Sequence, residues 1–323
     1  MMFTKVLLSS CAGKVPLFRA VEEAVLRVHP DASVVPGDSS DTVLLKYISK
    51  NFWRMPPVNE SYIEDIIEGC RRRGVTTVLP TRDGELLFWA KHKSQFKRVG
   101  IEVLVSPCES LRRCIDKLIF SKFGLANGWP FICTEKDINK LSSERFVVKE
   151  RFGAGSKSIG IDLSLEAALE HARSLQEPIF QPYIIGKEIS VDSWVDKSHK
   201  VKGVVLRHRQ KVVNGESQVT SSFRDRSLED LITNIIEGLE LNGPIVLQAI
   251  IDEMGGLHII ECNARFGGAS TLSLSVGLDS IYWSLIESLG EDVSRYPFIR
   301  RSEDIRQIRV STDIYTKVND IDF

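Results

Sequence analysis

The sequence predicts an α/β domain with a parallel sheet, followed by a longer region in which strands and helices are mixed. Over residues 1 to about 106, apolar strand-like runs alternate with helical stretches, a pattern typical of a parallel sheet covered on both faces. Further along, strands expected at 178–184, 188–195 and 201–208 follow one another. The 323 residues are enough for two or three packed layers or domains.

The N-terminal elements follow from apolar runs and the residues that end them. Strands are expected at 5–10, 32–36, 75–79 and 101–105, and helices at 15–28 and 84–98. Ser61 and Glu64 form a capping box, so a further helix should begin there and end at Gly74. The turn after the first strand lacks the G-x-G-x-x-G spacing of dinucleotide sites. Residues 81–85 follow a strand and form either a substrate-contact loop or a capped surface loop.

Beyond residue 107 the pattern predicts a helix at 116–127, a strand at 146–150, a Gly-rich loop at 153–160 and a helix at 164–175. After the three strands named above, a helix is expected at 227–240 and a last helix at about 270–289. The polar segment 300–323 has weak periodicity and receives no assignment.

Composition excludes several classes of protein. An apolar content of 43% and a net charge of −1 are ordinary for a globular protein and give no electrostatic footprint for nucleic acid or membrane. No apolar stretch approaches the roughly 20 residues that a membrane helix needs, and the start of the chain resembles a first strand more than a signal peptide. The six cysteines include no C-x-x-C pair, which indicates a reducing cytoplasm and no structural zinc.

The stretch from Glu261 to Arg265 carries the strongest functional signal. Strand alternation puts Glu261, Asn263 and Arg265 on one face and Cys262 and Ala264 on the other. Carboxylate and amide oxygens suit a hard cation, and a neighbouring guanidinium suits an anion. Because Cys262 points to the opposite, packed face, we expect a core cysteine there and not a nucleophile.

A second apolar run at 245–251 precedes this strand, with Asp252 to Gly256 as the turn of a hairpin. If Asp252 pairs with Leu257, Gln248 lies opposite Glu261 and shares its face. This register predicts an oxygen-rich cluster of Gln248, Glu261 and Asn263 beside Arg265. The alternative is an exposed polar edge that binds no ligand.

Two weaker patterns suggest phosphate and nucleotide binding. The loop at 153–160 can bring backbone N–H groups close to phosphate oxygens, with Lys149 and Lys157 adding positive charge, although it is not a Walker A motif. The segment 179–188 runs from a strand through Gln181 and Gly186 to Glu188; it offers backbone groups to a purine and a carboxylate to a ribose, or it is an ordinary hairpin.

Three basic residues, Arg207, Arg209 and Lys211, alternate and should share a strand face. They hold either a carboxylate or γ-phosphate, or they form a solvated edge. Gly267 to Ser270 begin the last expected helix, whose N–H groups either hold a substrate anion or end in an ordinary cap.

The order of these features resembles the ATP-grasp superfamily, in the branch of the carbamoyl-phosphate-synthase large subunit. The resemblance covers almost the whole chain, including Cys114-Ile115-Asp116-Lys117. It implies an α/β parallel-sheet (pre-ATP-grasp) domain at 1–106, followed by an α+β ATP-grasp fold of two subdomains. The small subdomain with its Gly-rich lid would span 107–183, the large subdomain 184–300 and a C-terminal tail 301–323.

The resemblance also implies roles for individual residues. The nucleotide would be bound by residues of the two basic positions, the lid, the hinge and the ribose-binding acid: Lys117, Lys149, Gly155, Ser156, Lys157, Ser158, Gln181, Pro182, Tyr183, Ile184 and Glu188. Gln248, Glu261 and Asn263 match the magnesium-binding positions, and Arg265 matches the arginine that stabilises the transferring phosphate. Arg265, Lys149 and Arg209 are the expected catalytic residues. Three positions depart from the commonest pattern: Gln248 and Gln181 where acids are frequent, and Ala264 where a proline is frequent.

The resulting prediction is a cytoplasmic, ATP- and Mg²⁺-dependent carboxylate–amine ligase that acts through an acyl-phosphate and releases ADP and phosphate; Mn²⁺ is an alternative metal. Its partners would be a small-molecule carboxylate and an amine, with no nucleic acid or membrane, and a homodimer is expected by analogy. Two other classes stay open: an enzyme that phosphorylates carbamate or bicarbonate, and a catalytically silent ATP-binding protein.

Overall fold

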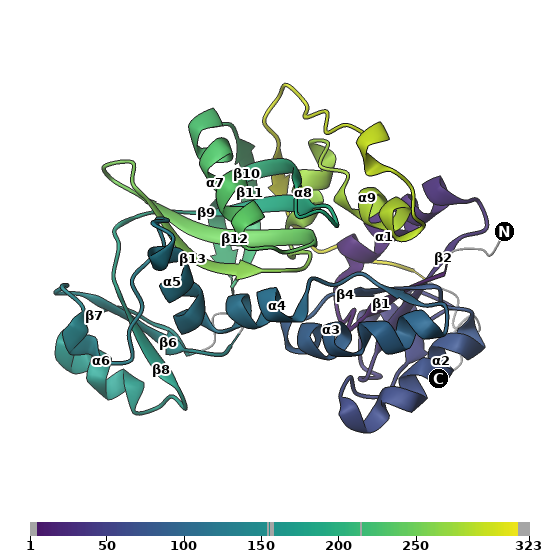
Figure 1. Cartoon of the computed structure of the whole chain (residues 1–323), viewed down its shortest axis with the longest axis horizontal. Helices are drawn as coiled ribbons and strands as arrows, with labels where there is room; N and C mark the ends of the chain where they lie inside the picture. The colour runs from purple at the N-terminus through teal and green to yellow at the C-terminus, as the bar shows by residue number, and fades with distance from the viewer. Residues whose placement is uncertain (1–4, 154, 156–157, 214, 316–323) are drawn as a thin grey trace.

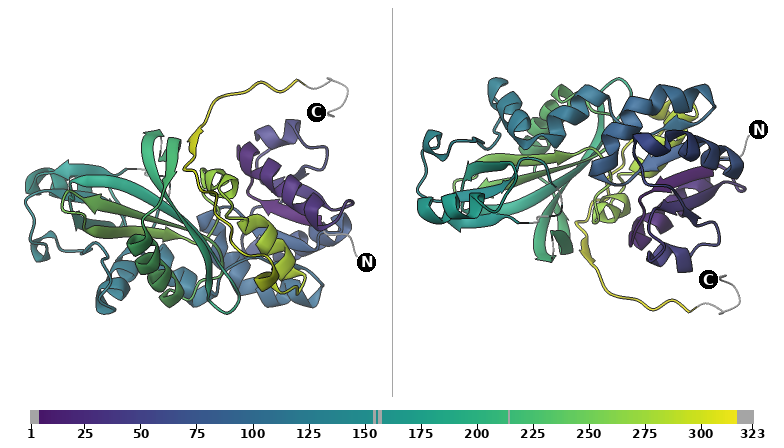
Figure 2. Two further views of the ribbon diagram at one scale, coloured as in Figure 1. Left: turned by 90° about the horizontal axis from the view of Figure 1, so that it is seen from above. Right: turned by 90° about the horizontal axis from the view of Figure 1, so that it is seen from below.

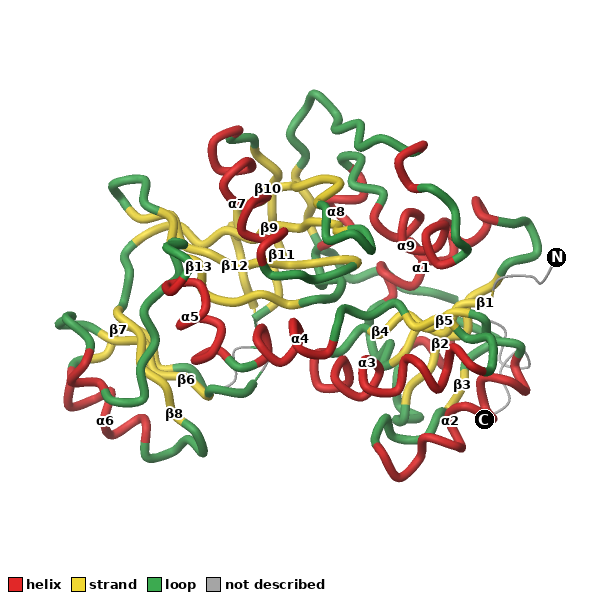
Figure 3. The backbone as a smooth tube through the Cα atoms, in the orientation of Figure 1, coloured by secondary structure: helices red, strands yellow, loops and turns green. Residues whose placement is uncertain are grey.

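The computed structural model describes residues 5–153, 155, 158–213 and 215–315, and in these residues the strands form three sheets. Figure 1 shows the N-terminal five-stranded sheet at one end of the molecule, a three-stranded sheet at the other, and a six-stranded sheet between them. Figure 3 shows the same arrangement with the helices packed around the sheets. This division confirms the predicted fold class, a parallel-sheet domain followed by an α+β region with two sheets.

The N-terminal sheet is parallel, with strand order β3-β2-β1-β4-β5. Its carboxyl ends bring Ser9 of β1 beside Pro80 of β4, so the loops after these two strands are neighbours. The elements are β1 (Lys5–Ser9), α1 (Val15–Val28), β2 (Ser33–Asp38), β3 (Trp53–Arg54), α2 (Ile63–Arg73), β4 (Thr77–Pro80), α3 (Asp83–Arg98) and β5 (Glu102–Val103).

The predicted capping box at Ser61 is wrong. Ser61 lies inside a short 3₁₀ turn (Glu60–Tyr62) that leads into α2, and the Asn59 side chain accepts a hydrogen bond from Ser61 N at 3.0 Å. Asn59 therefore takes the capping role that the sequence pattern assigned to Ser61. The predicted end of the helix is confirmed, because Gly74 adopts the left-handed conformation that glycine tolerates best.

The three-stranded sheet has the order β7-β6-β8 and carries one helix. The preceding chain forms two consecutive helices, of which only the second was predicted. The elements are α4 (Cys108–Ile115), α5 (Lys117–Ala126), β6 (Phe146–Glu150), β7 (Gly160–Leu163), α6 (Leu165–Ala172) and β8 (Pro178–Pro182). Asp116 caps α5 by accepting from Leu118 N and Ile119 N, each at 3.1 Å.

The six-stranded sheet is antiparallel, with the order β13-β12-β9-β10-β11-β14. Its elements are β9 (Gly186–Val195), β10 (Val201–Val213), β11 (Glu216–Phe223), α7 (Arg226–Gly238), β12 (Gly243–Asp252), β13 (Leu257–Asn263), α8 (Ser270–Ser275), α9 (Ser280–Ser288) and β14 (Arg306–Ile308). Since β14 pairs with β11, the sheet extends beyond residue 300 into the segment expected as a tail. After β14 the chain extends away from the body (Figure 2).

The single helix predicted at 270–289 is two helices. Gly277 separates α8 from α9 with a φ of 107°, and a Cβ atom there would lie 2.2 Å from the Ile299 carbonyl oxygen. The close approach of this backbone and the positive φ both require glycine, so the helix cannot continue through this point.

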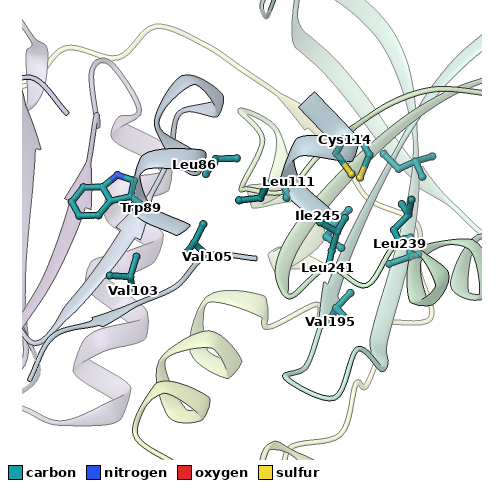
Figure 4. Packing of buried hydrophobic residues seen from close by; sticks show 14 of the residues in the cluster. Leu86, Trp89, Val103, Val105, Leu111, Cys114, Val195, Leu239, Leu241 and Ile245 are labelled. Carbon is teal, nitrogen blue, oxygen red and sulfur yellow. The ribbon is translucent and has the colours of Figure 1, made fainter. Parts of the chain in front are cut away.

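One hydrophobic core joins the N-terminal domain to the six-stranded sheet. Figure 4 shows Leu86 and Trp89 of α3 and Leu111 of α4 in the same cluster as Ile245 of β12 and Val195 of β9. All five side chains are almost fully buried. The short helix α4 is therefore packed between the two sheets, and this packing fixes the carboxyl edge of the N-terminal sheet relative to the large subdomain.

Candidate active site

A row of polar side chains crosses one face of the six-stranded sheet. Gln248 of β12 pairs with Glu261 of β13 on one side and with Ser190 of β9 on the other, and Ser190 pairs with Arg207 of β10. Directly paired residues share a sheet face, so these four residues lie in one row. The predicted apposition of Gln248 and Glu261 is confirmed.

A β-bulge produces this apposition. Near the turn Ile251, not Asp252, pairs with Leu257, because Asp252 N donates to Gly256 O at 2.9 Å; the predicted Asp252–Leu257 pair is wrong. The register then shifts between Gln248 and Ala249, and Ile260 is the extra residue. Without this shift Glu261 would share the buried face of Leu257 and Ile259.

The expected metal ligands lie together. Glu261 and Asn263 are half-buried on the open side of β13, and Cys262 and Ala264 are buried on the other, as predicted. Asn263 Nδ2 donates to Glu261 Oε1 at 3.2 Å, which leaves the Asn263 oxygen available to a cation. One carboxylate and two amide oxygens form a donor set of the kind that Mg²⁺ accepts, with water and phosphate oxygens completing the shell.

Two buried lysines from the other subdomain lie near this face. Lys149 of β6 is 5% exposed, and burial lowers its pKa to about 8, against the opposing effect of Glu261. Burial also lowers the pKa of Lys117, with Glu261 and Asp83 opposing. Lys117 Nζ donates to Gly153 O at 2.7 Å, at the start of the Gly-rich loop. The smaller subdomain thus places two ammonium groups within electrostatic range of Glu261.

Neighbouring side chains fix the position of Lys117. It is the first residue of α5, directly after the cap residue Asp116, and Arg151 donates to both oxygens of Asp116, from Nε at 2.8 Å and from Nη2 at 2.5 Å.

The rest of the Gly-rich loop is only partly described. Gly155 and Ser158 have positive φ values of 75° and 54°, and the predicted phosphate contacts Ser156 and Lys157 lie outside the described residues.

The predicted adenine and ribose contacts follow on β8 and β9. Gln181 is 2% exposed and donates to Thr134 Oγ1 at 2.7 Å, and Pro182 ends β8. The predicted hinge contacts Tyr183 and Ile184 lie in the link to β9, where Tyr183 N donates to Arg145 O at 2.8 Å. The sequence pattern of this segment suggests a tight turn at Gly186, but Gly186 instead begins β9, and a Cβ atom there would lie 2.4 Å from Ile251 O.

Two arginines on β10 pair with acids on β9. Arg209 Nη1 donates to Glu188 Oε1 at 2.7 Å, and burial raises the pKa of Glu188 against this opposing charge. Arg207, almost fully buried, forms an ion pair with Asp192, which also accepts from Ser270 at 2.6 Å and Ser273 at 2.7 Å. Among the described residues, Arg207 Nη1 and Arg209 Nε have no hydrogen-bond partner.

The prediction that Lys211 shares the strand face of Arg207 and Arg209 is wrong. The β10–β11 register shifts between Arg209 and Lys211, and Lys211 is exposed.

The serine at the start of α8 also has a role that the sequence did not reveal. Ser270 holds Asp192 and accepts a hydrogen bond from Gly267 N at 2.9 Å, so it ties the loop after Arg265 to the sheet.

Sequence reasoning missed the contact between Arg265 and the N-terminal domain. Arg265 Nε and Nη2 donate to Asp83 Oδ2 at 2.9 and 2.5 Å, and Nη1 donates to Phe266 O at 2.9 Å. Asp83 is the first residue of α3 and lies in the 81–85 loop that the sequence singled out. That loop position after a parallel strand was the one signal that could have found it.

Two family models match this architecture. A family described as ATP-grasp in the biosynthetic pathway with Ter operon matches residues 174–311, and one described as the PylC-like N-terminal domain matches residues 6–104. The chain contains an ATP-grasp domain. It follows a PylC-like N-terminal domain, and the resemblance to the ATP-grasp superfamily is confirmed.

Similar proteins extend this assignment. The large chain of carbamoyl phosphate synthase from Methanosarcina barkeri is 23% identical over 245 residues, which are 67% of this chain and 22% of that protein. The chain therefore spans about a fifth of this curated relative. A second similar protein is the biotin carboxylase domain of 2-oxoglutarate carboxylase from Hydrogenobacter thermophilus, solved with MgADP and bicarbonate. It matches with a TM-score of 0.75 at 18% identity, and the match covers 95% of this chain and 74% of that chain. An L-amino acid ligase from Bacillus licheniformis has a TM-score of 0.69 at 16% identity over 92% and 77% of the two chains. These structures share the ATP-grasp fold.

No helix in the described part of the chain is long and apolar enough to cross a membrane.

Proposed function

We propose that the protein is an ATP- and Mg²⁺-dependent carboxylate–amine ligase. The observation that carries this proposal is that three sets of groups lie near one another: two buried lysines, the Gln248–Glu261–Asn263 oxygens, and Arg265. Cations beside a metal-binding oxygen cluster suit a polyphosphate, and the positions match those of ATP-grasp enzymes. The ADP-bound biotin carboxylase domain and the L-amino acid ligase that share this fold are consistent with it.

The chain's own residues would act mainly by positioning and charge. Glu261, with Asn263 and Gln248, would hold Mg²⁺, which offsets phosphate charge when bound. Lys149 and Lys117 would bind phosphate oxygens, and Glu188 would accept from ribose hydroxyls. Because Lys117 and Lys149 are buried, their contacts with phosphate would stabilise the transition state more than they would in bulk water.

The reaction would proceed in two displacements. A carboxylate oxygen of the substrate attacks the γ-phosphorus, so a new O–P bond forms as the bond to the bridging oxygen of ADP breaks. The amine nitrogen then attacks the acyl carbon; the C–N bond forms, the C–O bond to phosphate breaks, and the amine loses one proton. Arg265 would offset charge on the transferring phosphoryl group and on the leaving phosphate.

The test is release of ADP and phosphate with Mg-ATP and a panel of carboxylates and amines. Transfer of ¹⁸O from a labelled carboxylate to the released phosphate would support the acyl-phosphate, and mass spectrometry of the product separates a ligase from an enzyme that releases carbamoyl phosphate. Glu261→Ala and Arg265→Ala should each lose acceptor-dependent turnover. Glu253→Ala, an exposed acid in the turn of the same hairpin, is the matched control. Full activity in both site variants would refute the proposed site.

A further inference from the structure

The carboxyl edge of the N-terminal sheet presents a second polar cluster beside Arg265. It consists of Lys14 after β1, Thr81 after β4, and Asp83 and Glu85 of α3. Asp83 touches Arg265 across the domain boundary, and both side chains are 20% exposed. Asp83 is also within electrostatic range of Lys14 and Lys117. The carboxylate thus lies next to the arginine proposed to bind the acyl-phosphate, at the edge where open α/β sheets place ligands.

The loops that surround Asp83 are tightly held. Lys14 Nζ donates to Thr81 O at 2.5 Å, to Thr81 Oγ1 at 2.8 Å and to Ser10 O at 3.3 Å. Glu85, 6% exposed, accepts from Ser9 Oγ at 3.0 Å and from Ser10 Oγ. Ser10 and Ala12 adopt positive φ values of 52° and 40°, and strained backbone of this kind persists where surrounding contacts over-determine it and is frequent at ligand sites.

These contacts decide which charge the cluster can accept. An ammonium group has three donors, and all three of Lys14 are committed to the two loops. Arg265 is committed to Asp83 and to Phe266 O through three of its N–H groups. Both Arg265 bonds to Asp83 use Oδ2, and no described residue donates to Oδ1. Two N–H groups of Arg265 remain for an anion, and Asp83 Oδ1 remains as an acceptor for a ligand that carries hydrogen-bond donors.

The charges of the cluster also permit a cation. Lys14 and Arg265 are opposed by Asp83 and Glu85, so the four groups are balanced before a ligand binds. The transfer of a phosphoryl group to a substrate beside Arg265 would add negative charge. A cation at Asp83 Oδ1 would then be attracted from both sides, and its nitrogen would lie near the acyl carbon that it must attack.

We propose that Asp83 Oδ1 binds the nucleophile of the ligation as a cationic primary amine, which loses one proton to solvent water before its nitrogen attacks and a second proton as the amide forms. The inference rests on the proposed ligase function. It assigns the amine subsite to the N-terminal domain, while the carboxylate and ATP would be held by the small and large subdomains. Asp83 then has two contacts with distinct consequences: Oδ2 orients Arg265, and Oδ1 recognises the ammonium group.

Hydroxylamine separates these two contacts. It is uncharged near neutral pH and traps an acyl-phosphate as a hydroxamate, so its reaction needs ATP, the carboxylate and Arg265 but no ammonium site. In Asp83→Asn the amide oxygen can still accept from Arg265. Hydroxamate formation with a panel of carboxylates should therefore fall by much less than amide formation with a primary amine. The KM for a primary amine should rise about 10- to 100-fold, as expected when a hydrogen bond between charged groups is lost.

Asp65→Asn is the matched control, because Asp65 lies in the first turn of α2 on the exposed surface of the same domain. An unchanged amine KM in Asp83→Asn would overturn the proposal. Equal loss of hydroxamate and amide formation would also overturn it, since Asp83 would then act only through Arg265 or the fold.

A direct measurement of amine binding tests the amine subsite separately from the ligase function. Ligand-observed NMR without ATP should detect wild-type binding of primary amines but not of the alcohols of the same shape, and Asp83→Asn should abolish the difference. If this pattern holds while no carboxylate yields hydroxamate, the ligase function is wrong and the subsite stands. If hydroxamate forms but no amine binds in preference to its alcohol, the ligase function stands and the amine subsite is wrong.

Discussion

The six-stranded sheet and the N-terminal sheet both place charged groups around Arg265, but they hold them in different ways. On the six-stranded sheet the groups lie on strand faces, and each is fixed by the residue paired with it on the next strand, as Gln248 is with Glu261. On the N-terminal sheet they lie in the loops after β1 and β4. There Lys14 and Glu85 are held by the backbone and hydroxyl groups of the opposite loop.

This difference separates two kinds of task. A strand residue cannot move without shifting the register of the whole sheet, so a strand face suits groups whose geometry must match Mg-ATP. A loop can change its length and residues without disturbing the sheet beneath it. We therefore expect the strand face to serve the proposed ATP chemistry and the loops at the edge of the N-terminal sheet to select the substrate.

Replacing the acid of the strand face should give the largest effect. Glu261→Ala removes the one carboxylate among the three expected metal ligands, so Mg-dependent turnover should fall at least about 1,000-fold, equivalent to several kcal/mol of lost charge stabilisation. Gln248→Ala removes a neutral ligand that water can replace, and its loss should be much smaller. Steady-state ADP release measured against Mg²⁺ concentration checks both. Equal losses of turnover in Glu261→Ala and Gln248→Ala would contradict the expectation that the carboxylate is the more important of the two expected ligands.

The buried ion pair between Arg207 and Asp192 should give the next largest effect, on stability. Arg207→Met leaves Asp192 buried without its cation, and such a loss costs about 3–5 kcal/mol. Adding Asp192→Asn should recover much of that cost, because no unpaired charge remains. Unfolding in urea, followed by tryptophan fluorescence, gives the free energies. Arg209→Met, whose partner Glu188 is partly exposed, should cost less.

The pKa of Lys149 predicts a pH dependence of nucleotide binding. Burial lowers this pKa to about 8, so the free protein loses the ammonium charge as the pH rises through about 8. The Kd for ADP without metal should therefore increase, by up to about tenfold from about pH 7 to about pH 9.5. Lys149→Arg stays charged over this range and should flatten the profile. Calorimetric titration of ADP measures both; a flat wild-type profile would contradict the assignment of Lys149 to phosphate.

The sequence was most informative where the structure is local. The helix at 15–28 and the strand at 146–150 were predicted with the bounds of α1 and β6, because apolar periodicity and end signals lie within each segment. β11 was missed because its residues are mostly polar and it is held by pairing with β10 and β14. The short helix α4 was missed since two turns carry little periodicity, and its Leu111 and Cys114 gain their stability from a core that spans two domains.

The same distinction applies to the site. The apposition of Gln248 and Glu261 could be predicted because a hairpin brings neighbouring residues together, although the bulge at Ile260 could not. Asp83 and Arg265 are separated by 182 residues, and their contact depends on how two domains pack. No pattern within either segment encodes that packing. A motif therefore located Arg265, and only the fold revealed its partner.

The smallest effect concerns the start of α2, which lies away from the candidate active site. Asn59→Ala removes the side chain that accepts from Ser61 N, so local stability should fall by about 1 kcal/mol. Ser61→Ala should change it by less than about 0.5 kcal/mol, since the Ser61 side chain caps nothing. Hydrogen exchange of the peptide that spans 60–73 reports this end of the helix directly, and Mg-ATP turnover should not change in either variant. The reverse order would restore the capping box that the sequence predicted. If turnover is lost while the fold stays intact, the change at the start of α2 must act on the loops at Asp83 from the far side of the N-terminal domain. That result would contradict the division between a rigid strand face and replaceable loops.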